Sequence, residues 1–204
     1  KVDLDFTVEG QAAHAGRPDT GINAIVAAAA AIARLRTGRI DAQTTSNVGV
    51  ISGGKARNIV PDRAEVAVEV RSTDKDRLER EVQAILDTFT AAAAINGARL
   101  HVQQSKSFET YTLPESHPVV ANAFLAARSL DITPALWTSG GGTDANIFNT
   151  RGLASVGLGL GIEDAHSPRE HITVAHLETG VRYIRALLTE AVTSAGAASP
   201  SAPR

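Results

Sequence analysis

The stretch Lys1-Val-Asp-Leu-Asp-Phe-Thr-Val-Glu9 decides the fold of the first half of the chain. Its apolar and polar residues alternate strictly, which predicts a β-strand with one buried face. Beyond it, two stretches have apolar residues at helical spacing, and three shorter ones are typical of strands. The predicted elements are a strand at 1–9, a helix at 22–33, strands at 45–51 and 64–70, a helix at 74–95 and a strand at 100–102. This βαββαβ order predicts an α+β domain of the ferredoxin-like, split-βαβ type over residues 1–107.

The second half, residues 108–195, changes to an α/β alternation. The pattern predicts helices at 118–130, from Asp144 and from Val174, with short strands at 135–137 and 154–158. Two short strands and three helices cannot cover both faces of a parallel sheet. We therefore expect this half to be part of a larger α/β domain. The tail at 196–204 is rich in Ala, Ser and Pro and is predicted to be disordered.

Composition excludes several classes of protein. The 204 residues carry a net charge of −2, which gives no basic field for nucleic acid. No apolar stretch approaches the roughly 20 residues of a membrane span. The chain has no cysteine, so it has neither disulfides nor a thiolate metal site. It also has no methionine and begins inside a strand pattern, so we expect a piece of a longer chain.

Three polar residues of the first half are candidates for substrate contacts. His14 lies among small residues after the first strand, where an imidazole stays accessible to a substrate oxygen. Asn58 offers a donor and an acceptor, and Arg71 offers a fork that suits a carboxylate. Each also has a purely structural interpretation. His14 would then be a surface or capping residue, Asn58 would satisfy its own turn, and Arg71 would face water at a strand end.

The second half contains a glycine loop, Ser139-Gly-Gly-Gly142, and a histidine-containing loop. Glycines let a ligand approach the backbone closely, so Gly141, Gly142 and Thr143 are candidate pocket residues, although Thr143 could equally be a helix N-cap. His166 follows a predicted strand and is the best candidate metal ligand, but the stretch around it supplies no complete ligand set.

Taken together, these motifs resemble those of the dimeric zinc exopeptidases of the peptidase T and glutamate carboxypeptidase type, especially the peptidase T-like tripeptidases. They follow the family order from Val2 to about Val192. The matching stretches are Glu9–Gly16, Gly53-Gly54 with Asn58–Pro61, Arg71, Ser139–Asn146, Gly152–Val156 and His166–Glu170.

The resemblance implies a domain organisation and a role for each candidate residue. It makes 1–107 a ferredoxin-like lid and dimerisation domain, and 108–195 the C-terminal half of a catalytic domain. His14 is then the lid histidine that stabilises the oxyanion in the partner's active site. Asn58 and Arg71 hold a substrate carboxylate, while Gly141, Gly142 and Thr143 line the pocket. Of the family's metal ligands, only the last histidine is represented, by His166. The other metal ligands and the general base have no counterpart in this sequence.

The implied activity is zinc-dependent hydrolysis of short peptides, tripeptides in the first place. Two zinc ions, with cobalt or manganese as alternatives, would be held mostly by residues outside this sequence, so we expect the chain alone to be inactive. The implied partners are a peptide substrate and a second copy of the lid, joined through an edge strand such as 44–51, in the cytoplasm. Two alternatives stay open: an amidohydrolase of the same family acting on N-acyl or N-carbamoyl amino acids, and a non-catalytic dimerisation or binding module.

Overall fold

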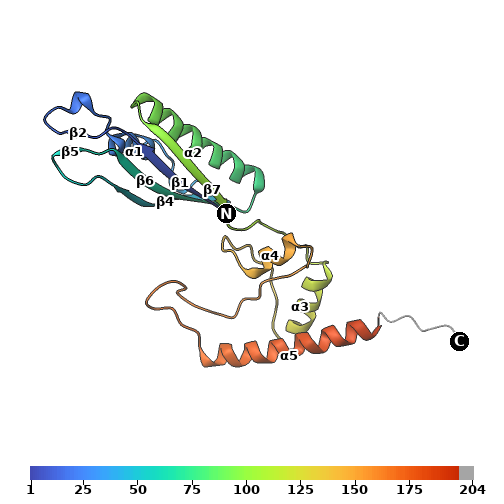
Figure 1. The fold of residues 1–204 in the computed structure, drawn as a ribbon. Coiled ribbons are helices and arrows are strands. Elements are labelled where there is room, and N and C mark those ends of the chain that lie inside the picture. The colour runs from blue at the N-terminus through green and yellow to red at the C-terminus, as the bar shows by residue number, and fades with distance from the viewer. Residues whose placement is uncertain (198–204) are drawn as a thin grey trace. The chain divides into compact units, whose positions relative to one another are not determined.

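The structure is a computed structural model that describes residues 1–197. The chain divides into two compact units (Figure 1). The first comprises Lys1–Thr110 together with Ser139–Gly142, and the second comprises Tyr111–Thr138 and the residues from Thr143 onward.

The first unit is built on a five-stranded antiparallel sheet with the order β3-β4-β6-β1-β7. Apart from the short β3, this is the strand order of a ferredoxin-like βαββαβ unit, so the predicted fold is confirmed. The last strand is longer than predicted, because its polar half pairs with β1 as regularly as its apolar half does. The strands of this sheet are β1 (Val2–Glu9), β3 (Gly38–Arg39), β4 (Thr44–Gly53), β6 (Arg63–Ser72) and β7 (Arg99–Lys106).

Two helices, α1 (Ala24–Ile32) and α2 (Lys75–Ile95), cover one face of this sheet (Figure 1). Asn23 and Asp74 cap them, each accepting a hydrogen bond from the backbone NH three residues later. The alternating apolar residues of β1 point under these helices, where the rings of Phe6 and Phe89 stack with centroids 3.8 Å apart. The opposite face of the sheet carries the charged residues of the strands.

A small ribbon that the sequence does not predict extends from this unit. It pairs β2 (Ala13–His14) with β5 (Ile59–Val60), and the 3-10 helix η1 (Pro18–Thr20) follows β2. Strands of two residues have too few positions to show a period of two, so no alternation marks them in the sequence.

The second unit contains α3 (Pro118–Arg128), α4 (Asp144–Thr150) and α5 (Val174–Ala197). Its buried apolar side chains are few and mostly those of alanines on α3. The strands predicted at 135–137 and 154–158 do not form. A strand needs a hydrogen-bonded neighbour, and no segment in the described part of this unit provides one. The predicted tail lies outside the described residues from 198 onward. No helix within 1–197 is long and apolar enough to cross a membrane.

Candidate functional site

The ribbon brings together two of the residues predicted to contact substrate, His14 and Asn58. His14 pairs with Ile59 in the ribbon ladder, and the backbone NH of Ala15 donates to the carbonyl of Asn58 at 3.0 Å. Both residues are exposed. The two side chains therefore project from neighbouring positions of one ribbon, although they are more than forty residues apart in sequence.

The orientation of the His14 imidazole is fixed by its own loop. The backbone NH of Gly16 donates to Nδ1 of His14 at 3.0 Å. Because Nδ1 accepts this bond, the neutral ring carries its proton on Nε2. A Cβ at position 16 would lie 3.1 Å from Nδ1, so glycine leaves room for the bond. His14 thus presents an N–H donor to any group that meets the ribbon.

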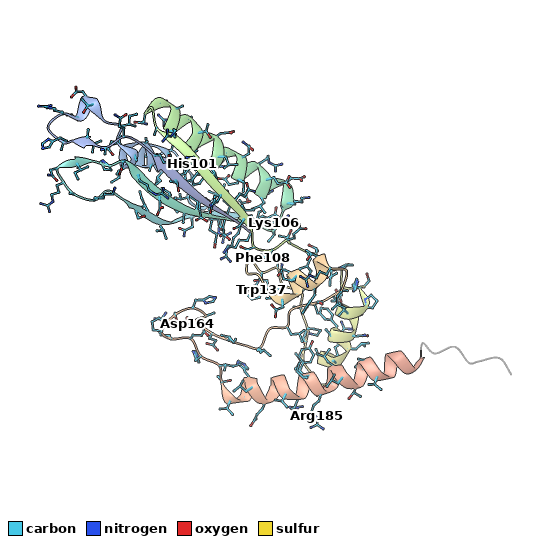
Figure 2. The ribbon with its side chains drawn as sticks, in the orientation of Figure 1. His101, Lys106, Phe108, Trp137, Asp164 and Arg185 are labelled. Carbon is cyan, nitrogen blue, oxygen red and sulfur yellow. The ribbon has the colours of Figure 1, made fainter. Side chains whose placement is uncertain are left out.

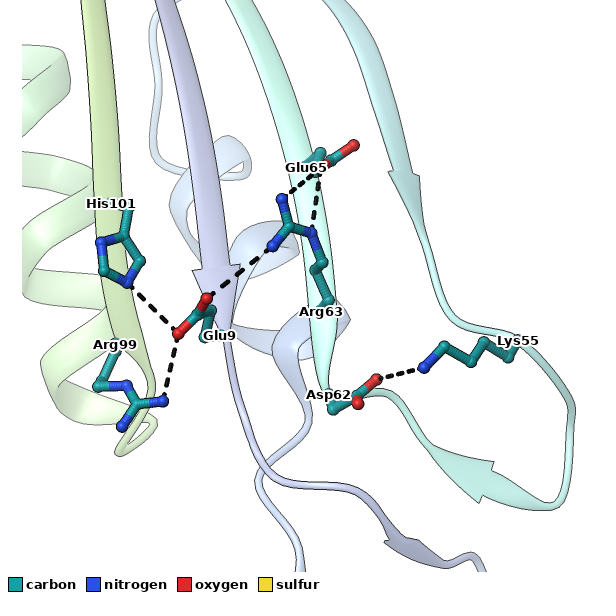
Figure 3. A network of polar contacts seen from close by, with 7 residues as sticks. All are labelled: Glu9, Lys55, Asp62, Arg63, Glu65, Arg99 and His101. Atoms are coloured by element: carbon teal, nitrogen blue, oxygen red, sulfur yellow. Dashed lines mark hydrogen bonds and ion pairs between the residues drawn. The ribbon is translucent and has the colours of Figure 1, made fainter.

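A charged network on the open face of the sheet holds the base of the ribbon (Figure 3). Oε2 of Glu9 lies 3.3 Å from Nε2 of His101 and 3.2 Å from an Arg99 nitrogen, and Arg63 lies 3.9 Å from Oε1. The hydrogen bond from His101, assisted by Arg99, lowers the pKa of Glu9. The next residue, Gly10, donates to the carbonyl of Asp62 at 2.9 Å. The network thus joins the ends of β1, β6 and β7 where the ribbon begins.

Arg71 lies near the far end of β6 and is held by Glu69, two residues earlier on the same face of the strand. Nε of Arg71 donates to Oε1 of Glu69 at 2.5 Å, and Nζ of Lys1 lies 2.7 Å from Oε2. These contacts, chiefly the hydrogen bond from Arg71, lower the pKa of Glu69 to about 2. One terminal nitrogen of Arg71 donates to the carbonyl of Gly140 at 3.4 Å. Glu69 is not among the predicted site residues, although two charged residues at spacing i, i+2 in a predicted strand are a visible signal.

Asn58 and Arg71, predicted to act as a pair, do not meet within one chain. Asn58 precedes the start of β6, while Arg71 is its second-to-last residue. From Arg63 to Arg71 alone the strand advances about 26 Å, at 3.3 Å per residue. An extended tripeptide spans only about 10 Å. A single small substrate therefore cannot contact both residues of the same chain.

The glycine loop has a structural reason for its composition. A Cβ on Gly142 would lie 2.3 Å from the ring of Phe108, so this position accepts only glycine without rearrangement. The NH of Gly141 donates to Oγ of Ser139 at 3.1 Å. Thr143 is the N-cap of α4, as its structural interpretation predicts, and its NH donates to Oδ1 of Asn146 at 2.9 Å. Local hydrogen bonds from backbone NH groups to the side chains of Ser139 and Asn146 thus fix the loop.

His166 lies in a strained, exposed loop of the second unit. Its φ of 65° and that of Asp164, 52°, are in the left-handed region that residues with a side chain rarely adopt. The NH of His166 donates to Oε2 of Glu170 at 2.5 Å, and Arg169 pairs with Asp164 at 3.2 Å. Within residues 1–197, no three His, Asp or Glu side chains form a group that could hold a metal ion. The residues present therefore do not by themselves fit the two-zinc site that the resemblance implies.

The first unit also has a groove of about 380 Å³ between α2 and β7. None of the predicted site residues lines it. His14 and Asn58 instead stand on a projecting ribbon, which is an arrangement suited to entering another surface rather than to enclosing a ligand.

Comparisons with known proteins show which proteins this chain is similar to. Residues 2–96 match the model of the peptidase dimerisation domain of the M20 family. A solved tripeptidase from Staphylococcus aureus shares 33% identity over 91% of this chain and 50% of its own, with a TM-score of 0.85. The uncharacterised protein YqjE of Bacillus subtilis is 36% identical over 89% of this chain and 49% of its own length. The N-acetyldiaminopimelate deacetylase of Leuconostoc mesenteroides is 30% identical over 81% of this chain and 44% of its own. The chain thus spans about half the length of these relatives.

Proposed function

Since this chain belongs to the M20 family of peptidases and amidohydrolases, we propose that it is the dimerisation and substrate-binding part of a metal-dependent enzyme that hydrolyses short peptides. The observation that carries the proposal is the geometry of His14. Its Nδ1 is engaged by Gly16, so Nε2–H is the free donor on a projecting ribbon. A donor in that position stabilises the oxyanion that forms when a peptide carbonyl is attacked.

The three polar residues divide between two subunits. His14 and Asn58 share a ribbon, whereas Arg71 lies a whole strand away. One substrate is therefore held by His14 and Asn58 of one subunit and by Arg71 of the other. Glu69 engages Nε of Arg71 and the carbonyl of Gly140 accepts from one terminal nitrogen, so the other terminal nitrogen is the one available to a substrate carboxylate.

A homodimer through the β4 edge supplies the second subunit. Only β3 covers this edge, at two residues, so the outer side of 47–53 has no strand partner within the described chain. Val50 and Ile51 on β4 and Val26 on α1 are about half exposed. The opposite edge, β7, is instead lined by Arg99, His101 and other polar residues. Pairing two β4 edges would extend the sheet and bury these apolar side chains.

In the proposed enzyme, most of the residues that bind the metal ions lie outside this chain. His166 supplies one ligand, and the loop strain there supports a functional role. The other ligands come from the segment that corresponds to the unmatched half of the relatives. Zinc is the first candidate, with cobalt and manganese as alternatives. The cytoplasm, which the family resemblance implies, is the proposed location.

To test the proposal, this chain is joined in one chimeric polypeptide to the part of YqjE that lies outside the matched region. We expect the chimera to hydrolyse a tripeptide when zinc, cobalt or manganese is added, and 1–204 alone to be inactive. His14→Ala should lower kcat by about 10²–10³ with little change in KM, as loss of an oxyanion donor does. His117→Asn is the control, since His117 only caps α3. Unchanged kcat in His14→Ala would contradict the role of His14.

Subunit exchange tests the division between subunits. His14→Ala and His166→Ala chimeras should each be inactive, because one lacks the donor and the other a metal ligand. Mixed dimers contain one site with both residues intact, so the mixture should recover about a quarter of the original activity. No recovery after exchange would show that His14 acts in its own subunit.

Deacylation of an N-acyl amino acid is the second candidate activity. The 30% identity to a deacetylase over four fifths of this chain favours it. Measuring the same chimera with N-acetyl, N-carbamoyl and tripeptide substrates distinguishes the two reactions. A well-folded, metal-loaded chimera that hydrolyses none of them would favour the non-catalytic module.

A further inference from the structure

Strand β7 forms one edge of the five-stranded sheet, and its outer side has no strand partner among residues 1–197. All of its residues except Leu100 are exposed. The strand runs alongside α2 (Figure 1), and Figure 2 labels two of its residues, His101 and Lys106. β7 is therefore open to a further strand along its whole length.

The backbone of β7 alternates between groups that bond to β1 and groups that point outward. The NH of Ser107 donates to the carbonyl of Lys1 at 3.2 Å, so these two residues form a hydrogen-bonded pair. In an antiparallel ladder such pairs alternate with pairs that share no hydrogen bond. The register of β1 and β7 then directs outward the NH and carbonyl groups of Leu100, Val102, Gln104 and Lys106. At about 3.4 Å per residue, they form a row of donors and acceptors about 20 Å long.

The same four residues place their side chains on the helix side of the sheet, because each is paired with a buried residue of β1. On that side lies the groove of about 380 Å³ between α2 and β7. Val102, on β7 itself, is 38% exposed. A strand added to β7 would therefore direct every second side chain toward apolar surface. The groove contributes four apolar side chains from β1 and α2 to that surface: Val2, Leu78, Val82 and Leu86.

The charge of this edge selects the kind of strand that can be added. β7 carries Arg99, His101 and Lys106 and no acidic residue. The side chains of Arg99 and His101 lie on the open face and are 78% and 62% exposed. The acidic residues of β1 lie one strand further away, about 9.5 Å from an added strand, which is close to the Debye length at physiological ionic strength. Carboxylates on the open face of an added strand are thus attracted by β7 more than they are repelled by β1.

We propose that the β7 edge and the groove beside it bind an extended acidic segment of a partner protein, in which apolar residues alternate with Asp or Glu. Its backbone pairs with the outward groups of β7, its apolar side chains enter the groove, and its carboxylates lie beside Arg99 and His101. In this mode of recognition the main-chain bonds give affinity, and pockets for alternate side chains give specificity. The inference does not depend on the hydrolytic activity, since none of His14, Asn58 and Arg71 lines the groove.

A second copy of this chain fits the β7 edge less well. Two β7 strands paired with each other would bring together two basic edges without an acidic residue on either. Like charges on paired strands are destabilising, and basic residues on an edge strand oppose self-pairing. The β4 edge carries no charged residue, so it is the edge at which self-pairing is expected.

Peptides of defined sequence test the proposal on 1–204. The probe is a blocked, fluorescently labelled heptapeptide in which glutamate alternates with leucine. In one control peptide lysine replaces the glutamates, and in another serine replaces the leucines. We expect fluorescence anisotropy to show binding of the probe and at least tenfold weaker binding of each control. No binding of the probe, or equal binding of all three peptides, would overturn the proposal.

Amide hydrogen exchange, followed by NMR residue by residue, shows whether the peptide occupies the edge. Saturating peptide should slow exchange at least tenfold at the outward NH groups of Val102 and Gln104. The NH groups of Gln103 and Ser105 bond to β1 and should change less than twofold. Unchanged exchange at 102 and 104 would contradict the proposal. So would protection of these two groups in the chain alone that rises with its concentration, because a second copy would then occupy the edge.

Two substitutions separate the contribution of backbone pairing from that of charge. Val102→Pro removes an outward NH but no hydrogen bond to β1, so it should weaken binding of the probe at least tenfold, whereas Val102→Thr should stay within threefold. Arg99→Glu should weaken binding at least fivefold. Arg80→Glu makes the same change of charge at an exposed position of α2 and should stay within twofold. Binding that survives both Val102→Pro and Arg99→Glu would show that the peptide does not use the β7 edge.

Discussion

The first unit covers the apolar side chains of its sheet with its own two helices, whereas in the second unit a row of apolar side chains on α5, from Val174 to Val192, is exposed. In the first unit the partners lie within one stretch of about a hundred residues, so β1 finds both its strand neighbours and its helical cover there. In the second unit, α3 and α5 pack together, but no described residue covers the apolar row of α5. Regularly spaced apolar residues are thus buried in a core in the first unit and exposed on α5 in the second.

Truncating one apolar side chain in each unit should give the largest expected difference, measured as the loss of stability of that unit. Phe89→Ala removes a ring stacked on Phe6 and should destabilise the first unit by about 3–5 kcal/mol. Ile184→Ala removes a half-exposed side chain and should cost less than about 1 kcal/mol in the isolated chain. Hydrogen exchange resolved by peptide measures both, with Phe89→Leu as the conservative control. Equal losses for the two alanine variants would contradict the difference between the units.

Acid should weaken the first unit through Glu69. Its pKa in the folded chain is about 2, below the ordinary 4.5, because Arg71 and Lys1 stabilise the carboxylate. A lowered folded-state pKa contributes stability that is fully present above about pH 4.5 and is lost as the pH falls toward 2. Since the side chain is about one third exposed, we expect a contribution of about 1–2 kcal/mol rather than the full value of the shift.

Urea unfolding of the first unit between pH 6 and 2 measures this contribution. Glu69→Gln should flatten the pH dependence in that range, and Glu65→Gln, an exposed position on the same strand, should leave it in place. An unchanged acid response in Glu69→Gln would show that Glu69 carries no such contribution.

The sequence predicts the elements whose partners are close in the chain. Alternation in β1 and the helical spacing of α2, with Asp74 as its cap, lead directly to the ferredoxin-like unit. The strands expected at 135–137 and 154–158 do not form because propensity alone cannot supply a hydrogen-bonded neighbour. The ribbon is not predicted for the same reason, because only their pairing defines its two-residue strands.

The candidate site is predictable in composition but not in arrangement. The small residues around His14 indicate an accessible imidazole, yet the Gly16 bond that leaves Nε2–H free is a property of the folded loop. The separation of Asn58 from Arg71 depends on the direction of β6, which no local pattern specifies. The candidate role of His166 stays a prediction, because a metal site depends on ligands that the described residues do not bring together.

The central claim is that the first unit is a self-contained dimerisation domain that uses the β4 edge. Sedimentation velocity on 1–204 tests it most directly, with Ile51→Asp at that edge and Gln103→Asp at the opposite edge, β7, as the matched pair. The account predicts a dimer for the unaltered chain and for Gln103→Asp, and a monomer for Ile51→Asp. A monomer in all three, or a dimer that survives Ile51→Asp and is lost in Gln103→Asp, would contradict it.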